Sequence, residues 1–184
     1  MPCPQTFELK GLALNCDANL GGIVKAWFAP AGQFVPTVSA STHTCTIARA
    51  ETTASGATMK LYEFNKETGS LVSTQVVNEQ NGSNYYQNLV NLAFNRMEGW
   101  KHFEINSLAQ SELDAVILDS NGIKWWVPGV KSIGSEIATT GTATDDRNGY
   151  TLALQANSPN LPYEVSMTDE AFAGIADQTV PASN

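Results

Sequence analysis

The chain has 184 residues, with 18 acidic and 10 basic side chains and a formal charge of -8. An average surface of this charge repels nucleic acid and anionic membranes, so a nucleic-acid reader is not expected. Only 15% of the residues are charged, and the polarity comes mainly from Ser, Thr, Asn and Gln, which suit strands and turns better than long helices. These features predict one mainly β domain with its own core.

The N-terminal sequence MPCPQTFELK lacks the apolar core of a secretion signal, and no window approaches the roughly 20 apolar residues of a membrane span. We therefore expect a soluble product made in the cytoplasm, with no membrane partner. The cysteines Cys3, Cys16 and Cys45 are odd in number and lack C-x-x-C spacing. Free, mostly buried thiols are the expected state.

The first third of the chain is predicted to form short strands joined by turns. Strands are expected at Phe7–Leu14 and Ile23–Ala29. Residues 30–58 combine proline, glycine and small hydroxyl side chains, so we expect a long loop with at most two short strands, at Val35–Val38 and Thr44–Ala48.

A hairpin is predicted next, because Met59–Asn65 and Leu71–Val77 alternate cleanly on either side of the turn Lys66–Gly69. The following strand, Ser83–Arg96, has the two-residue period of a half-buried strand. Its two faces carry different side chains: Tyr86, Val90, Leu92 and Phe94 on one, and Gln87, Asn91 and Asn95 on the other.

The only convincing helix spans Glu98–Gln110, where Ile105, Leu108 and Ala109 recur at helical spacing. After it, LDAVILDSNGIKWWV is two apolar runs separated by Asn121-Gly122, which predicts a β-hairpin. Adjacent strand residues point to opposite faces, so one indole of Trp125-Trp126 is expected in the core while the other faces solvent or a partner.

The C-terminal third is predicted to contain an alternating strand, YTLALQA, after the turn Asp145–Gly149, and an edge strand at Tyr163–Met167. Residues 169–184 are small, acidic and contain proline. We interpret them as a mobile arm, with a brief helix around Glu170–Ala176, attached to a single domain over residues 1–168.

The sequence contains few residues and motifs that are typical of catalytic sites. No nucleophile elbow, phosphate loop, dinucleotide fingerprint or zinc-protease motif is present, and His43 and His102 are the only histidines. Asp145 and Asp146 are typical of a turn, and Asn81-Gly82-Ser83 matches a glycosylation acceptor that has no use without export. We expect no enzyme activity, no cofactor and no metal site.

Four segments carry a resemblance to a known family: SNYYQNLVNLAFNRM, EGWKHFEINSLAQ, LDAVILDSNGIKWWVPG and RNGYTLALQANSPNLPYEV. Together with the acidic, mainly β composition and the long early loop, their order resembles the tail tube (major tail) proteins of long-tailed bacteriophages. The resemblance covers roughly the second half of the chain as an order of elements rather than a strict motif. It implies a β-sandwich or barrel-like fold with one flanking helix, in a virion structural protein that is not an enzyme.

The resemblance also implies that six copies form a ring whose inner strands close a barrel, and that rings stack into a tube for DNA passage. The partners would be other copies, neighbouring tail or neck proteins, and DNA in transit. An acidic or uncharged wall lets a duplex slide without binding. We expect two sets of residues on these grounds: lumen-facing Ser73, Gln75, Gln87, Asn91 and Asn95, and interface-forming Phe34, Val35, Val38 and Trp126.

Two other classes fit the same sequence. A phage head decoration or neck protein shares the acidic balance and the lack of catalysis, but forms a small closed oligomer. A glycan-binding β-sandwich module would use Trp125, Trp126, Tyr85 and Tyr86 as a stacking surface.

Overall fold

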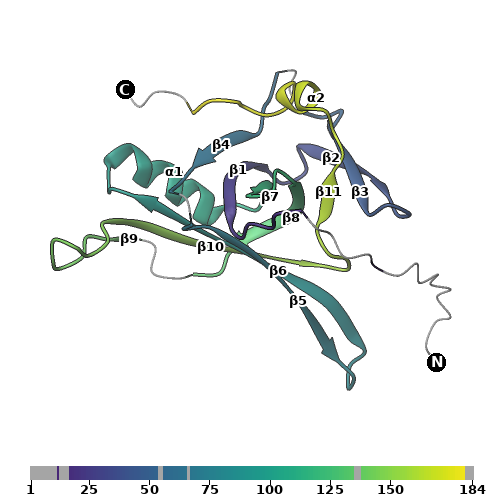
Figure 1. Ribbon diagram of the computed structural model, residues 1–184, viewed down its shortest axis with the longest axis horizontal. Helices are drawn as coiled ribbons and strands as arrows, with labels where there is room; N and C mark the ends of the chain where they lie inside the picture. The colour runs from purple at the N-terminus through teal and green to yellow at the C-terminus, as the bar shows by residue number, and fades with distance from the viewer. Residues whose placement is uncertain (1–11, 13–16, 54–55, 66, 135–137, 181–184) are drawn as a thin grey trace.

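The computed structural model describes residues 12, 17–53, 56–65, 67–134 and 138–180. The predicted mainly β class is confirmed (Figure 1). In chain order the described elements are β1 (Ile23–Pro30), β2 (Phe34–Ser39), β3 (Thr44–Arg49), β4 (Lys60–Glu63), β5 (Ser70–Asn78), β6 (Ser83–Asn95), α1 (Gly99–Gln110), β7 (Leu113–Asp119), β8 (Lys124–Ser132), β9 (Ala138–Thr139), β10 (Gly149–Ser158), β11 (Tyr163–Val165) and α2 (Asp169–Ala173).

The strands form two layers that share β8. The first sheet has the order β4-β1-β7-β8-β11-β3-β2, and the second consists of β5-β6-β10 with β9 and the end of β8 alongside β10. Trp125 and Trp126 of β8 pair with β11, whereas Lys131 and Ser132 pair with β10. One strand therefore joins the sheets by backbone hydrogen bonds.

A β-bulge lets β8 change sheets. Leu113 pairs with Val130 but Ala115 pairs with Val127, so β8 carries one residue more than β7 between these pairs. Gly129 has φ 66° within this bulge, a conformation that glycine adopts without strain. The extra residue bends β8 away from the first sheet toward β10.

Two hydrophobic cores lie on the two faces of the first sheet. The first core fills the space between the sheets and includes Phe28, Val90, Leu92, Ile117 and Leu152. The second core lies on the other face of the first sheet, and its members include Trp27, Phe34, Val116, Trp126 and Phe172. Because both faces are covered, β7 reads as a nearly continuous apolar run.

The predicted helix and the Asn121-Gly122 hairpin are confirmed as α1 and β7–β8. Ile105 and Leu108 bury the inner side of α1 in the first core. The Tyr62 hydroxyl donates to Glu104 Oε2 at 3.1 Å, which connects α1 to β4. The helix therefore closes the space between the sheets at one end (Figure 1).

The predicted hairpin between Met59–Asn65 and Leu71–Val77 is wrong. β4 pairs with β1, and β5 pairs with β6. The chain crosses between the sheets at Gly69, where a Cβ atom would lie 2.6 Å from Ile23 Cγ1. The turn signal was correct, but the two strands beside it belong to different sheets.

Residues from Asp169 to Asp177 pack on the second core, contrary to the expectation of a mobile arm. Phe172, Ile175 and Ala176 are buried, and the Trp27 indole N–H donates to the Asp177 carbonyl at 2.8 Å. The brief helix expected there is present as α2.

β11 also differs from its prediction, because it lies inside the first sheet between β8 and β3 instead of at an edge. The strand predicted at Phe7–Leu14 lies outside the described residues except for Leu12. Within the part of the chain that the structure describes, no helix has the length and apolar character to cross a membrane.

Candidate functional site

The second sheet presents an uncharged face on the side away from the core. Residues that pair across antiparallel strands share a face, and Val90 and Leu92 point into the first core. The opposite parity therefore points outward. We call this set the outer face; its members are Ser70, Val72, Thr74 and Val76 of β5, Tyr85, Gln87, Leu89, Asn91, Ala93 and Asn95 of β6, and Thr151, Ala153, Gln155 and Asn157 of β10.

No member of the outer face is ionisable at neutral pH, although the whole chain carries a formal charge of -8. Lys131 of β8 pairs with Gln155 at the margin, and its ammonium lies 2.9 Å from a Glu112 carboxylate oxygen. That ion pair cancels the charge next to the face. The face is therefore an uncharged strip of polar and apolar side chains across three strands.

The five expected lumen residues do not share one face. Gln87, Asn91 and Asn95 lie on the outer face, as their parity in β6 predicts. Ser73 pairs with Asn88 and Gln75 pairs with Tyr86, so both lie on the opposite face. The Ser73 hydroxyl donates to the buried Asn88 side chain at 2.6 Å. The position of Ser73 and Gln75 follows from the register between β5 and β6, which parity within one strand does not define.

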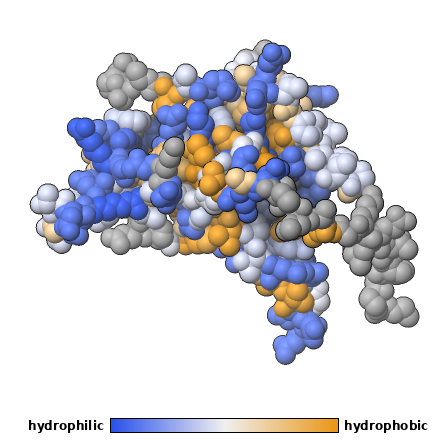
Figure 2. Space-filling view, viewed as in Figure 1, coloured by the Kyte–Doolittle hydropathy of each residue, from blue (hydrophilic) through white to orange (hydrophobic). Residues whose placement is uncertain are grey.

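The distal halves of β5 and β6 protrude from the body as a hairpin (Figure 1). Pairing of β10 with β6 ends at Tyr86, so the residues from Val76 to Tyr85 form a two-stranded hairpin. We call this segment the protruding hairpin. Val77 is 59% exposed within it, and apolar surface is visible along it in Figure 2, short of a hydrophilic tip. A two-stranded hairpin that is wet on both faces gains little stability from its own contacts.

β5 is also an open edge, since β6 is the strand that pairs with it in the described structure. Its free backbone N–H and C=O groups can pair with another chain. The edges of the first sheet are β2 and β4, and Pro36 removes one N–H donor from β2. The edge of β5 contains no proline and is longer.

No protein-family model, curated protein or solved structure matches the chain.

The four expected interface residues divide between core and surface. Phe34 and Trp126 are 2% and 1% exposed in the second core, so a contact with another chain through them is excluded for the folded subunit. Val35 and Val38 are exposed, but they lie on opposite faces of β2. Their separation by three residues in a strand explains this.

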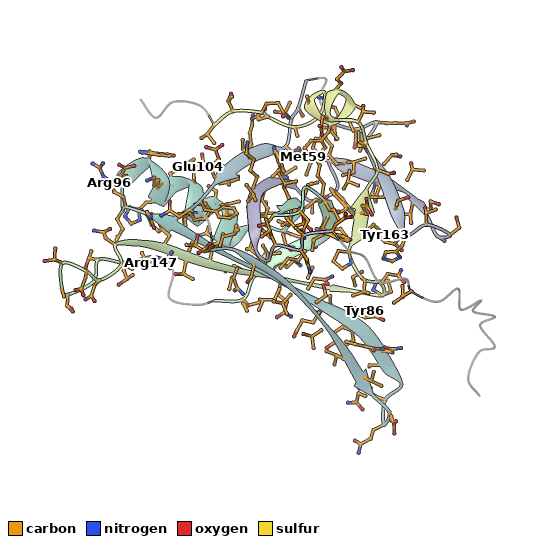
Figure 3. The ribbon with its side chains drawn as sticks, viewed as in Figure 1. Met59, Tyr86, Arg96, Glu104, Arg147 and Tyr163 are labelled. Carbon is orange, nitrogen blue, oxygen red and sulfur yellow. The ribbon has the colours of Figure 1, made fainter. Side chains whose placement is uncertain are left out.

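The aromatic residues considered for glycan stacking do not form one surface. Trp126 is buried in the second core, and its indole N–H has no hydrogen-bond partner among the described residues. Trp125 packs against the first core and donates its indole N–H to Asp119 Oδ2 at 3.1 Å. Tyr85 and Tyr86 lie on opposite faces of β6 (Tyr86 is labelled in Figure 3).

A groove of about 600 Å³ lies between the base of the protruding hairpin and the body. Its apolar lining includes Leu71, Trp125 and Leu161. The polar side chains along it are used within the chain: Asp119 accepts from the Asn121 and Ile123 backbone N–H groups, and His43 bonds the Leu161 carbonyl. Among the described residues that line the groove, no available polar groups converge on one point.

Asp114 was not singled out by sequence, although a carboxylate inside the apolar run LDAVILD is a visible signal. It is 5% exposed and accepts the Gly32 N–H at 2.9 Å and the Gly129 N–H at 3.0 Å. Burial raises the pKa of this carboxyl, and the two backbone N–H groups partly oppose that rise. Asp114 thus ties the β1–β2 turn to the bulge in β8.

The remaining ionisable candidates have structural contacts. The Asp146 carboxylate accepts from Thr142 and Ala143, and these hydrogen bonds hold its pKa below the usual range. His102 contacts the Tyr150 ring edge-on, while Glu98 pairs with Lys101 at 3.0 Å. Among the described residues, no group of three or more His, Cys, Asp or Glu side chains could hold a metal ion.

Cys45 is buried, and desolvation raises the pKa of its thiol to about 11. It is a free thiol, as predicted. Cys3 and Cys16 lie outside the described residues.

Proposed function

We propose that the chain is a virion structural protein that self-assembles into stacked rings forming a phage tail tube for DNA passage. The outer face carries this proposal. In a ring that turns this face inward, the lumen wall consists of uncharged side chains, with Gln, Asn, Ser and Thr beside the apolar Val72, Val76 and Leu89. Such a wall is hydrated but does not bind the DNA phosphates, because DNA binding depends largely on counterion release at cationic groups.

The register defines the proposed lumen wall. Gln87, Asn91 and Asn95 remain in it, and Thr74, Gln155 and Asn157 join them, since they share the outer face. Ser73 and Gln75 are not part of this wall, because they lie on the opposite face of β5. In this arrangement α1 lies on the opposite side of the second sheet from the lumen, because it packs on the first core.

The edge of β5 and the protruding hairpin would form contacts between copies. A ring requires a heterologous interface, in which one surface patch of each copy meets a different patch of the next. An open edge supplies backbone hydrogen bonds for such a contact, and pairing removes an aggregation-prone edge. The exposed apolar side chains of the hairpin, Val77 among them, would become covered in the same step.

Electron microscopy of the purified protein over a range of concentrations tests the proposal. Tubes or stacked rings are expected, since assembly driven by mass action increases with protein concentration. Closed single rings that never stack would support a head or neck role instead. A monomer at every concentration, also by light scattering, would refute self-assembly.

A lysine pair tests the lumen directly. Gln87→Lys with Asn91→Lys adds two cations per copy to the outer face, and the ring multiplies them. Tubes are expected to form but to retain added double-stranded DNA at low salt, with release as salt increases. The matched control, Thr52→Lys with Thr179→Lys, adds the same charge at exposed residues elsewhere. Equal retention by both variants would show that the outer face does not line the lumen.

A further inference from the structure

The chain contains three Asn-Gly pairs, and the structure places each one in a different environment. They are Asn81-Gly82, Asn121-Gly122 and Asn148-Gly149. All three asparagines are exposed. Asparagine followed by glycine is prone to spontaneous loss of its amide, because no side chain on glycine hinders the approach of its backbone nitrogen to the asparagine Cγ.

Asn121 is held in place on both sides of its amide. Its Oδ1 accepts the Leu20 N–H at 2.8 Å, and its Nδ2 donates to Asn19 Oδ1 at 3.1 Å. The nitrogen that would attack belongs to Gly122, and its N–H donates to the Asp119 carbonyl at 3.2 Å. Reaction there requires these hydrogen bonds to open first.

Asn148 is held by the end of β6. Its Oδ1 accepts the Met97 N–H at 3.0 Å, and its carbonyl accepts the Arg96 N–H at 2.8 Å. Gly149 is buried in β10, where a Cβ atom would lie 2.1 Å from the Phe94 carbonyl oxygen. The backbone rotation that brings the glycine nitrogen to Cγ would break the pairing of β10 with β6.

Asn81 lies in the turn at the tip of the protruding hairpin, and its side chain is not tied to another segment of the described chain. No hydrogen bond within the described structure involves its Nδ2 or the Gly82 N–H, and nothing lies within 4 Å of the position of a Gly82 Cβ. Its Oδ1 accepts the Ser83 N–H at 3.1 Å. That donor belongs to the same turn, so it does not fix Asn81 to another segment as the Leu20 and Met97 donors fix Asn121 and Asn148.

We propose that Asn81 is a site of spontaneous deamidation in the folded protein. The Gly82 nitrogen, after losing its proton to solvent base, attacks Asn81 Cγ and forms a new N–C bond. The Cγ–Nδ2 bond breaks, and ammonia leaves with a proton from water. Water then opens the resulting succinimide at either carbonyl, giving aspartate or isoaspartate without any oxidant or cofactor.

The products alter the tip of the hairpin in two ways. Both add a negative charge to a chain that is already acidic, in a turn that also contains Glu79. Isoaspartate in addition inserts a methylene into the main chain between β5 and β6. This inference does not depend on the proposed assembly.

Peptide mapping by mass spectrometry tests the proposal on the full-length protein, incubated at neutral and mildly alkaline pH. We expect Asn81 to react at least about tenfold faster than Asn121 or Asn148, because each of those must release two or more hydrogen bonds that each contribute a factor of several. In urea the three sites should react at similar rates, since only the local Asn-Gly sequence then matters. Asn81→Gln should remove the rapid conversion and leave the slow sites unchanged.

First reaction at Asn121 or Asn148, or equal rates at the three sites in the folded protein, would overturn the proposal. So would an Asn81 rate that is much faster in urea than in the folded chain, because that would show protection of the tip. Circular dichroism of the incubated samples verifies that the protein stays folded during the measurement.

Discussion

Phe172 is expected to attach the C-terminal segment to the body, so truncating its side chain should lower the free energy of unfolding. The ring is 2% exposed and packs edge-on against Trp27 with 5.0 Å between ring centroids. The Lys124 ammonium lies 5.3 Å from the centroid of the same ring. α2 has five residues, too few to be stable as an isolated helix, so its position depends on this side chain.

Replacing Phe172 with alanine should destabilise the protein by about 3–5 kcal/mol, the range for truncating a buried phenylalanine. That is a large part of the roughly 5–15 kcal/mol that stabilises a typical domain. Phe103→Ala is the matched control, because Phe103 on α1 is 73% exposed, and its free energy of unfolding should change by no more than about 0.5 kcal/mol.

Urea unfolding followed by circular dichroism measures both variants, since the far-ultraviolet signal reports mainly the backbone structure. Similar midpoints for Phe172→Ala and Phe103→Ala would refute the docking of α2. A loss confined to residues 169–177 would also contradict it, because Trp27 and Val116 share the second core with Phe172. Hydrogen exchange distinguishes that local change from global destabilisation.

Three further predictions concern single residues. Asp114→Asn leaves one of two backbone N–H groups without its acceptor and should destabilise the protein by about 1–3 kcal/mol. Because the pKa of Asp114 is raised in the folded protein, its protonation stabilises the fold below the unfolded pKa, and this stabilisation is lost as pH rises through the folded pKa. Urea midpoints should therefore show the advantage of the wild type over Asp114→Asn growing from pH 7 toward pH 4. Gly69→Ala should destabilise the protein by about 1–3 kcal/mol in urea unfolding, because its Cβ meets Ile23 and Phe64. Gly99→Ala, with open space at the start of α1, should be neutral or slightly stabilising in the same assay. The Cys45 thiol, buried and with a pKa of about 11, should resist alkylation at pH 8 until the protein unfolds, as peptide-resolved labelling will show; rapid labelling in the native state would contradict its burial.

Local signals in the sequence were sufficient for the central elements. Val90, Leu92 and Phe94 alternate with polar residues, so both the strand and its buried face could be predicted. The helical spacing of Ile105 and Leu108 predicted α1. The Asn121-Gly122 turn predicted the β7–β8 hairpin. Each of these patterns is contained within about 15 consecutive residues, where the periods of strand and helix differ clearly.

The wrong predictions of strand pairing and of exposed faces arise where the structure depends on contacts between segments that are distant in the sequence. β4 and β5 flank a real turn, yet hydrogen bonding to β1 and β6 places them in different sheets. The assignment of Ser73 to the face of Gln87 needed the register between two strands, and a shift of one residue exchanges the faces.

The same reason explains the core and the C-terminal segment. Phe34 and Trp126 looked available because the second core is built from widely separated segments, which pattern analysis of single strands does not bring together. Phe172 and Ile175 are spaced as one face of a short helix, but their small and acidic neighbours concealed that signal.

The sharing of β8 has a mechanical consequence. A pull on the tip of the β5–β6 hairpin passes from β6 to β10 and then into β8, always between strands that run side by side. In this geometry the hydrogen bonds of β6 with β5 and β10 are loaded together along their strands, and the load then converges on the two residue pairs between β10 and β8. Force applied to the second sheet therefore reaches β7 and β11 through Lys131 and Ser132, and this short pairing of β10 with β8 bears the load between the two sheets.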